Sequence, residues 1–109
     1  MANTFKNRTL DLTDSYQDLI TAVASSTTTI VLGMRATNVD GTNSADIDVE
    51  FTDSDGSTKA LLASTMPVPA DSSLEVVSGK FVLETGDKIQ AKASAASDIE
   101  MFVSMLEIT

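Results

Sequence analysis

Apolar side chains recur at every second position in several short segments of this chain, and this period of two limits the possible folds more than any other feature. Residues 45–52 show it most clearly. Their apolar set is Ile47, Val49 and Phe51, and their acidic set is Asp46, Asp48 and Glu50. Successive side chains of a strand point to opposite faces, so the pattern predicts a strand with one buried and one solvated face. Such strands are typical of antiparallel sheets.

Turn residues separate the alternating segments. Asp-Gly pairs at residues 40–41 and 55–56 supply the positive backbone angles that tight turns need. Pro67 and Pro69 are expected to end the segment before them, because proline cannot donate to a central ladder. The expected strands cover residues 15–24, 28–39, 45–52, 58–66, 73–77, 80–84, 88–94 and 99–108. About eight strands with turn signals every 8–12 residues predict an all-β fold, a single antiparallel β-sandwich that is jelly-roll-like.

The N-terminal quarter of the chain is less regular. Residues 1–14 carry few large apolar side chains, so we expect an N-terminal arm or an irregular edge segment there, followed by one sandwich domain over residues 15–109. The apolar residues of segment 15–24 also match one face of a short helix: Tyr16, Leu19, Ile20 and Val23. We expect a strand instead, because every later segment is β and a lone short helix has little to pack against.

The last expected strand, residues 99–108, alternates imperfectly. One face holds Ile99, Met101, Val103 and Met105, and the other holds Phe102, Leu106 and Ile108. A β-bulge near Ser104 would explain the break in the pattern. Burial of both faces would also explain it, and a subunit interface buries a terminal strand in that way.

Missing residue types exclude several classes of function. The chain has 109 residues, with 7 Lys and Arg against 16 Asp and Glu, a net charge of −9, and no His, Cys or Trp. It therefore lacks the commonest general base, any thiol nucleophile and the means to neutralise a phosphate backbone. No segment approaches the roughly 18 apolar residues that span a bilayer, and no signal peptide is recognisable. We predict a protein made in the cytoplasm that is not an enzyme, has no catalytic residues, no cofactor and no metal ligands, and binds neither nucleic acid nor membrane.

Acidic turns offer the one alternative to this prediction. Asp53, Asp55 and Gly56 are similar to the start of a calcium-binding loop, but Ser64 occupies the position where such a loop needs a bidentate Glu. An Asp-Gly turn between two strands explains the same residues. A small module that binds a cation at its Asp-rich turns, or a glycan, stays open as an alternative function.

Two segments carry side chains that a monomer does not need. The N-terminal segment has an aromatic residue and two of the few cations, and the last strand has apolar residues on both faces. Cationic segments of an acidic protein can lie on the acidic surface of a neighbour. The predicted interface residues are Phe5, Lys6, Arg8, Met101, Phe102, Met105 and Leu106.

Several stretches resemble a family of small structural proteins from the virions of tailed phages, often phages of cyanobacteria and other aquatic hosts. The similar stretches are residues 1–7 (Met-Ala-Asn-Thr-Phe-Lys-Asn), 38–47 (Asn-Val-Asp-Gly-Thr-Asn-Ser-Ala-Asp-Ile), 67–74 (Pro-Val-Pro-Ala-Asp-Ser-Ser-Leu), 83–89 (Leu-Glu-Thr-Gly-Asp-Lys-Ile) and 104–108 (Ser-Met-Leu-Glu-Ile). The resemblance covers nearly the whole chain. It implies a structural role in a virion that is assembled in the host cytoplasm.

Within the virion, the expected role is that of a capsid decoration (cement) protein, which stabilises the head by binding across capsomers. The expected partners are the major capsid protein or other virion proteins, and further copies of the chain in a homo-oligomer, with a trimer favoured. A structural component of the tail, neck or fibre is the alternative within the virion.

Overall fold

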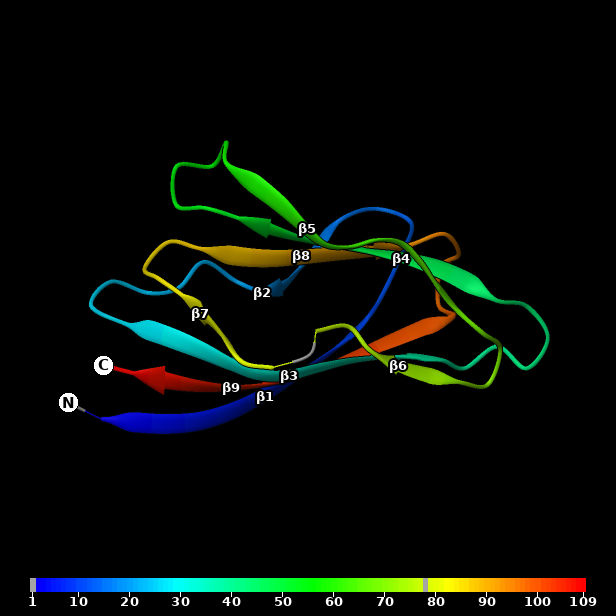
Figure 1. Cartoon of the computed structure of the whole chain (residues 1–109), viewed down its shortest axis with the longest axis horizontal. Coiled ribbons are helices and arrows are strands. Elements are labelled where there is room, and N and C mark those ends of the chain that lie inside the picture. The colour runs from blue at the N-terminus through cyan, green and yellow to red at the C-terminus, as the bar shows by residue number, and fades with distance from the viewer. Residues whose placement is uncertain (1, 78) are drawn as a thin grey trace.

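Nine β-strands in two antiparallel sheets, packed face to face, make up the computed structural model, which describes residues 2–77 and 79–109 (Figure 1). The strands are β1 (Asn3–Asp11), β2 (Gln17–Ile20), β3 (Thr28–Asn38), β4 (Ala45–Thr52), β5 (Lys59–Val68), β6 (Ser73–Glu75), β7 (Phe81–Leu83), β8 (Lys88–Ala93) and β9 (Ile99–Ile108). We call the sheet of β1, β3, β6, β7 and β9 sheet A, and the sheet of β2, β4, β5 and β8 sheet B. Within the described ranges there is no helix, and so none that is long and apolar enough to cross a membrane.

The strands pair from the two ends of the chain inward. β1 pairs with β9, β2 with β8, β3 with β6 and β7, and β4 with β5, always antiparallel. Sheet A has the order β1-β9-β3-β6, with β7 also on β3, and sheet B has the order β2-β8-β4-β5. This nested pairing is a long hairpin wrapped into two sheets, the arrangement of a jelly roll, in which β6 and β7 share the place of one strand. The predicted antiparallel sandwich is confirmed.

Aliphatic side chains and methionines fill the space between the two sheets. Ile47 and Val49 of β4 and Ile89 of β8 have no exposed surface, and neither does Val103 of β9 on the opposite sheet. The acidic residues that alternate with them on β4 are only partly exposed but point away from the core, as the period of two predicts. Burial of such side chains stabilises the fold by roughly 1.5–3 kcal/mol each.

Residues 3–11, for which the sequence predicts an arm or an irregular edge segment, form the regular edge strand β1. All nine residues pair with β9, from Asn3 opposite Ile108 to Asp11 opposite Glu100. The side chains of β1 are exposed on both faces except for Leu10, which packs partly against the core. Because the ladder with β9 rather than side-chain burial holds this strand, its sequence carries no clear apolar period.

Strand β5 extends past the point where the sequence predicts its end. It continues through Pro67, opposite Asp46, to Val68, which is fully buried. The prediction was wrong because β5 is an edge strand of sheet B, where a missing N–H donor is tolerated. The pairing of β5 with β4 also shifts register twice, and Thr65 has a positive φ of 48°.

The β-bulge expected near Ser104 lies on the neighbouring strand. β9 pairs with β1 without any shift, while β3 has an extra residue between Val31 and Gly33, opposite Met105 and Ser104. The alternation of β9 is therefore intact at its centre. The bulge also places Ile30 on the outer side of sheet A, although its spacing from the buried Met34 predicts a common face.

The segment at residues 15–24 contains a strand, as expected, but only over Gln17–Ile20. Its strand, β2, is short and pairs with β8 with one irregularity between Asp18 and Ile20. Leu19 and Ile20 are buried, and Val23 is buried just beyond the strand.

Candidate interaction surface

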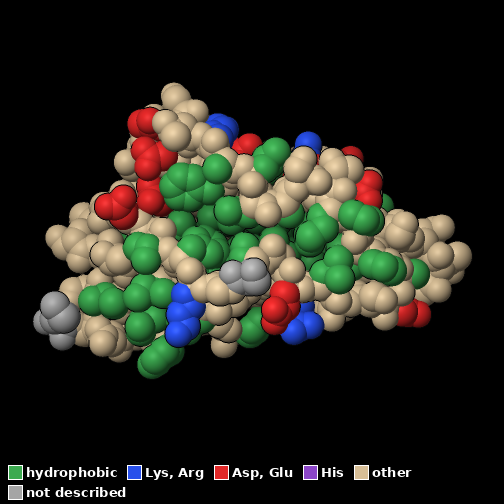
Figure 2. Space-filling view, viewed as in Figure 1, with side chains coloured by type: hydrophobic (Ala, Val, Ile, Leu, Met, Phe, Trp, Pro, Cys, Tyr) green, Lys and Arg blue, Asp and Glu red, His purple; other side chains and the backbone are tan. Residues whose placement is uncertain are grey.

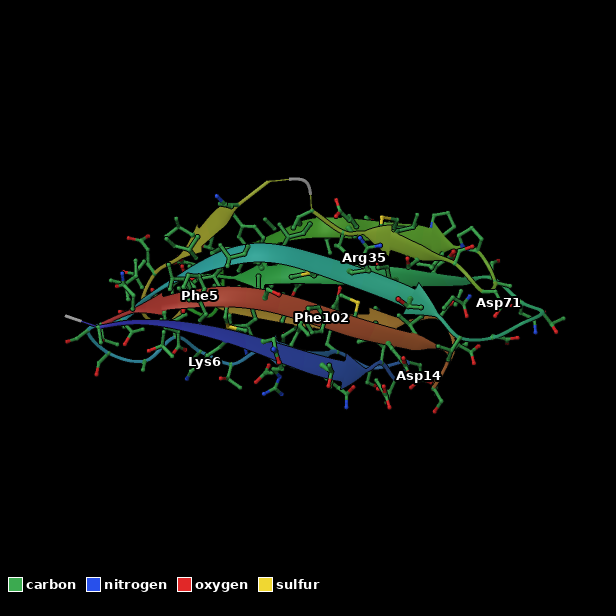
Figure 3. All side chains as sticks on the ribbon, turned by 90° about the horizontal axis from the view of Figure 1, so that it is seen from below. Phe5, Lys6, Asp14, Arg35, Asp71 and Phe102 are labelled. Atoms are coloured by element: carbon green, nitrogen blue, oxygen red, sulfur yellow. The ribbon has the colours of Figure 1, made fainter. Side chains whose placement is uncertain are left out.

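The outer face of sheet A, which points away from sheet B, carries large apolar side chains. Phe5 on β1 lies opposite Leu106 on β9, Leu106 lies opposite Ile30 on β3, and Ile30 lies opposite Val82 on β7. Phe102 is four residues before Leu106 on the same strand and on the same face. We call Phe5, Ile30, Val82, Phe102 and Leu106 the outer apolar face. Phe5, Val82 and Phe102 are 75%, 56% and 44% exposed, respectively, and Figure 3 shows this side of the sheet.

The outer apolar face is hollowed between its two aromatic side chains. Ser104, between Phe102 and Leu106 on β9, lies opposite Gly33 on β3 and opposite Asn7 on β1. Ser104 lines two shallow hollows, one of about 290 Å³ beside Phe5 and one of about 160 Å³ beside Phe102. Projecting rings next to a hollow are the kind of surface into which a partner's side chains can pack.

A charged pair borders this face at the β6 side. Arg35, opposite Phe102, forms an ion pair of 3.4 Å with Glu75 and donates a hydrogen bond to Ser73. The outward-facing residues around Phe5 and Leu106 are all uncharged. They are Asn3, Phe5, Asn7 and Thr9 on β1, and Phe102, Ser104, Leu106 and Ile108 on β9. This is unusual in a chain with a net charge of −9.

The outer face of sheet B has the opposite character. Its charged side chains pair with one another: Lys59 with Glu50 at 3.4 Å and Lys88 with Asp18 at 3.9 Å. The ammonium of Lys92 lies 4.9 Å from the centroid of the Tyr16 ring. Such surface pairs are solvated and contribute little stability, so this face is a solvated, charged surface.

The environment of Tyr16 reflects the same acidic surface. Partial burial raises the pKa of its hydroxyl, and the carboxylates of Glu50 and Asp48 raise it further. The Tyr16 hydroxyl therefore stays neutral to a higher pH than that of a free tyrosine.

The structure brings three of the seven predicted interface residues together. Phe5, Phe102 and Leu106 share the outer apolar face. Met101 and Met105 are 1% and 6% exposed and point into the core, because they occupy the alternate positions of β9. They are therefore not available to a partner in this fold.

The two predicted cations lie on the other side of β1 from Phe5. Lys6 forms an ion pair of 2.8 Å with Glu107, and Arg8 donates a 3.3 Å hydrogen bond to the backbone carbonyl of Asp18. Both line a cleft of about 300 Å³ between β1 and residues 20–24. Two members of the outer apolar face, Ile30 and Val82, were not predicted, since only strand pairing places them next to Leu106.

The Asp-Gly turns use their carboxylates internally. Asp55 accepts 2.8 Å hydrogen bonds from the backbone N–H groups of Ser57 and Thr58, and the Thr58 N–H is the main cause that lowers the pKa of Asp55. Asp40 accepts equivalent bonds from Thr42 and Asn43, and its pKa is lowered chiefly by the Thr42 N–H. The turn interpretation is confirmed, and over residues 2–77 and 79–109 no three carboxylates gather closely enough to hold a metal ion.

The nested strand pairing defines the class to which this fold belongs, the double-sheet jelly rolls. No protein-family model matches the sequence, and no curated protein matches it. Solved structures do share the fold. A Bacillus endospore appendage protein from disulfide-linked pili superposes with a TM-score of 0.58 at 16% identity, over 99% of this chain and 87% of that chain.

Two viral structures also share the fold. A chain in the acidic stable capsid of Helicobacter pylori bacteriophage KHP30 has a TM-score of 0.55 at 12% identity, over 100% of this chain and 89% of that chain. A chain of infectious bursal disease virus, Gx strain, has a TM-score of 0.52 at 11% identity, over 98% of this chain but 32% of that chain. At such low identities, these likenesses establish the fold.

Proposed function

We propose that this chain is a non-enzymatic structural subunit of a phage virion. The observation that carries the proposal is the difference between the two outer faces of the sandwich. The outer face of sheet B carries charged side chains along β4 and β8, whereas sheet A exposes Phe5, Val82 and Phe102 on one surface. Contiguous exposed apolar surface marks sites of protein–protein contact. The shared fold with proteins of capsids and pili supports a role in an assembly.

Within the virion, we assign the chain to capsid decoration. The outer apolar face would dock on the major capsid protein across capsomers, and the charged face of sheet B would point to solvent. The net charge of −9 keeps unbound copies soluble and apart. Bound copies would stabilise the shell by mass action, because they bind the assembled form only. Since the chain has no Cys, no disulfide holds such a contact.

The first test is the number of copies in a particle. Purified virions of the phage that encodes the chain are digested, and the chain is counted against the major capsid protein by quantitative mass spectrometry. Decoration predicts a copy number comparable to that of the capsid protein. A few copies per particle would instead support the neck, tail or fibre alternative, and absence from purified virions would overturn the virion role.

The second test identifies the docking face. Heads that lack the chain are mixed with the wild type or with the double variant Phe5→Asn, Phe102→Asn, and bound protein is measured after sedimentation. We expect the variant to lose binding, since both side chains are exposed in the free protein. Leu61→Asn is the matched control, because Leu61 is 51% exposed but lies on β5 of sheet B. Equal binding by the double variant would exclude the outer apolar face.

A further inference from the structure

Strand β1 differs from the other strands at the edges of the two sheets. β2 has four residues and an irregular register, and β6 and β7 have three residues each. β5 is long but contains Pro67 and two register shifts. Short length, proline, bulges and charged side chains, lysine above all, are the devices that prevent an edge from pairing with another chain. Of these, β1 has only the charges, with Lys6 and Arg8 on its inner side. β1 has nine residues, no proline and no shift against β9, and Figure 3 shows it as the outermost strand of sheet A.

The backbone hydrogen bonds at the ends of β1 reveal which of its groups face outward. Ala2 exchanges bonds with Thr109, and the Leu12 N–H donates to the carbonyl of Ile99. Paired residues in an antiparallel ladder alternate between bonded and non-bonded positions, so even-numbered residues of β1 bond to β9 and odd-numbered residues do not. The N–H and C=O groups at the free edge belong to Asn3, Phe5, Asn7, Thr9 and Asp11. β1 has β9 as its one strand neighbour in the described part of the chain.

We propose that β1 pairs with β1 of a second copy, antiparallel and about a twofold axis. A second copy can match nine regular residues only with its own β1, because its other sheet edges are short, bulged or interrupted. Full overlap places Asn7 opposite Asn7 of the second copy and Phe5 opposite Thr9. All five outward-facing residues of each strand then bond to the other strand.

The charges on β1 are compatible with this pairing. Full overlap places Lys6 opposite Arg8 of the second copy, which alone would be unfavourable. However, Lys6 is already paired with Glu107 at 2.8 Å, and the Arg8 guanidinium is turned to the carbonyl of Asp18. Both cations are therefore engaged within their own subunit.

The pairing would join two copies of sheet A into one continuous sheet. The outer apolar faces of both copies would then lie on the same side, with the two Phe5 side chains near the axis. The inference does not rest on the proposed function, since it concerns the edge of sheet A and not its face. It also predicts a dimer rather than a trimer, because two identical antiparallel strands are related by a twofold axis.

Proline substitution tests the edge contact. Asn7→Pro removes a donor that faces the free edge and leaves the ladder with β9 intact, and Asn7→Ala keeps the donor as a matched control. We expect sedimentation velocity to show a concentration-dependent dimer for the wild type and for Asn7→Ala. Asn7→Pro should raise the dissociation constant about tenfold or more, since the dimer loses two bonds. Wild-type protein that stays monomeric at millimolar concentration would overturn the inference.

Single cysteines test the register without any proline, because the natural chain has no Cys. With Asn7 on the axis in a hydrogen-bonded pair, its two Cα atoms lie about 5.5 Å apart. Side chains at such a pair are too far apart for a relaxed disulfide, but a methane-bridged bis-methanethiosulfonate reagent can span the two sulfur atoms. Asn7→Cys should therefore form a covalent dimer with this reagent. The two copies of residue 9 lie about 13 Å apart, at four residues of strand rise, so Thr9→Cys should not cross-link. Cross-linking of both variants or of neither would overturn the pairing.

Discussion

Phe5 of β1 lies directly opposite Leu106 of β9 on the outer face of sheet A. Opposite residues in an antiparallel pair have Cβ atoms about 4.5–5.5 Å apart, so the two side chains are neighbours. Phe5 is nevertheless 75% exposed, because β1 is the edge strand and no strand follows it. The backbone ladder, not burial, therefore fixes the place of the most exposed large apolar side chain in the described structure.

Neighbouring residues on β9 should respond very differently to truncation. Met101→Ala leaves a cavity in the core and is expected to lower the free energy of unfolding by about 2–5 kcal/mol. Phe102→Ala removes a side chain that is 44% exposed, and its effect should stay within about 1 kcal/mol. Urea unfolding followed by circular dichroism measures both. A larger loss from Phe102→Ala would mean that the outer face contributes to the monomer core.

Asn38 at the end of β3 is expected to be important for stability. It is 1% exposed, donates 3.0 Å hydrogen bonds to the carbonyls of Asn43 and Val68, and accepts one from the Asp40 N–H. Asn38→Ala leaves these groups unpaired and should cost about 2–4 kcal/mol in urea unfolding. Asn43→Ala, at an exposed position of the same loop, serves as the control and should stay within about 0.5 kcal/mol. Equal effects would contradict the role of Asn38.

Asp87 links two turns, and we expect its substitutions to destabilise the fold to different degrees. Its carboxylate accepts hydrogen bonds from the backbone N–H groups of Ser54 at 3.1 Å and Glu84 at 2.8 Å. Asp87→Ala leaves both donors without an acceptor and is expected to destabilise the fold by about 2–4 kcal/mol. Asp87→Asn retains one acceptor and should lose less. Thermal unfolding of the two variants measures which is less stable. A lower unfolding temperature for Asp87→Asn than for Asp87→Ala would contradict this network.

Acid should destabilise the protein partly through its two Asx turns. Backbone N–H donors lower the pKa of Asp40 and of Asp55 below their usual value of 3.8. The unfolded chain then binds protons at a pH where the folded form stays ionised, so this stability is present above about pH 4 and is lost as the pH falls further. The double variant Asp40→Asn, Asp55→Asn should show a smaller fall in urea midpoint between pH 5 and pH 3. An unchanged fall would assign the acid sensitivity to other groups.

Local sequence patterns predicted most of the strands, but not how the strands pair or in which register. Segment 45–52 has the predicted bounds, and Ile47 and Val49 of its predicted buried face are fully buried, while Phe51 is partly buried. Segment 28–39 was correctly predicted as a strand, which ends at Asn38, yet the bulge between Val31 and Gly33 changed which face Ile30 occupies. A single extra residue, Leu32, reverses the alternation. Gly33 directly after it is the local signal that could have indicated the bulge, because an isolated glycine within a strand often marks one.

The candidate surface could be predicted only in part for the same reason. Phe5, Phe102 and Leu106 stood out as apolar residues near the ends of the chain, but so did Met101 and Met105, which the fold buries. Strand register separates the two groups. The register of β9 depends on its neighbours β1 and β3.

The sequence by itself determined that the chain is an all-β sandwich with aliphatic packing, Asp-Gly turns and one acidic solvated face. These properties depend on side-chain period and turn chemistry within a few residues, and both are local. Only the tertiary structure decided that Asn3 pairs with Ile108, that β1 is an open edge and that five apolar side chains meet on sheet A. Those outcomes depend on contacts between residues far apart in the chain, which local preferences do not specify.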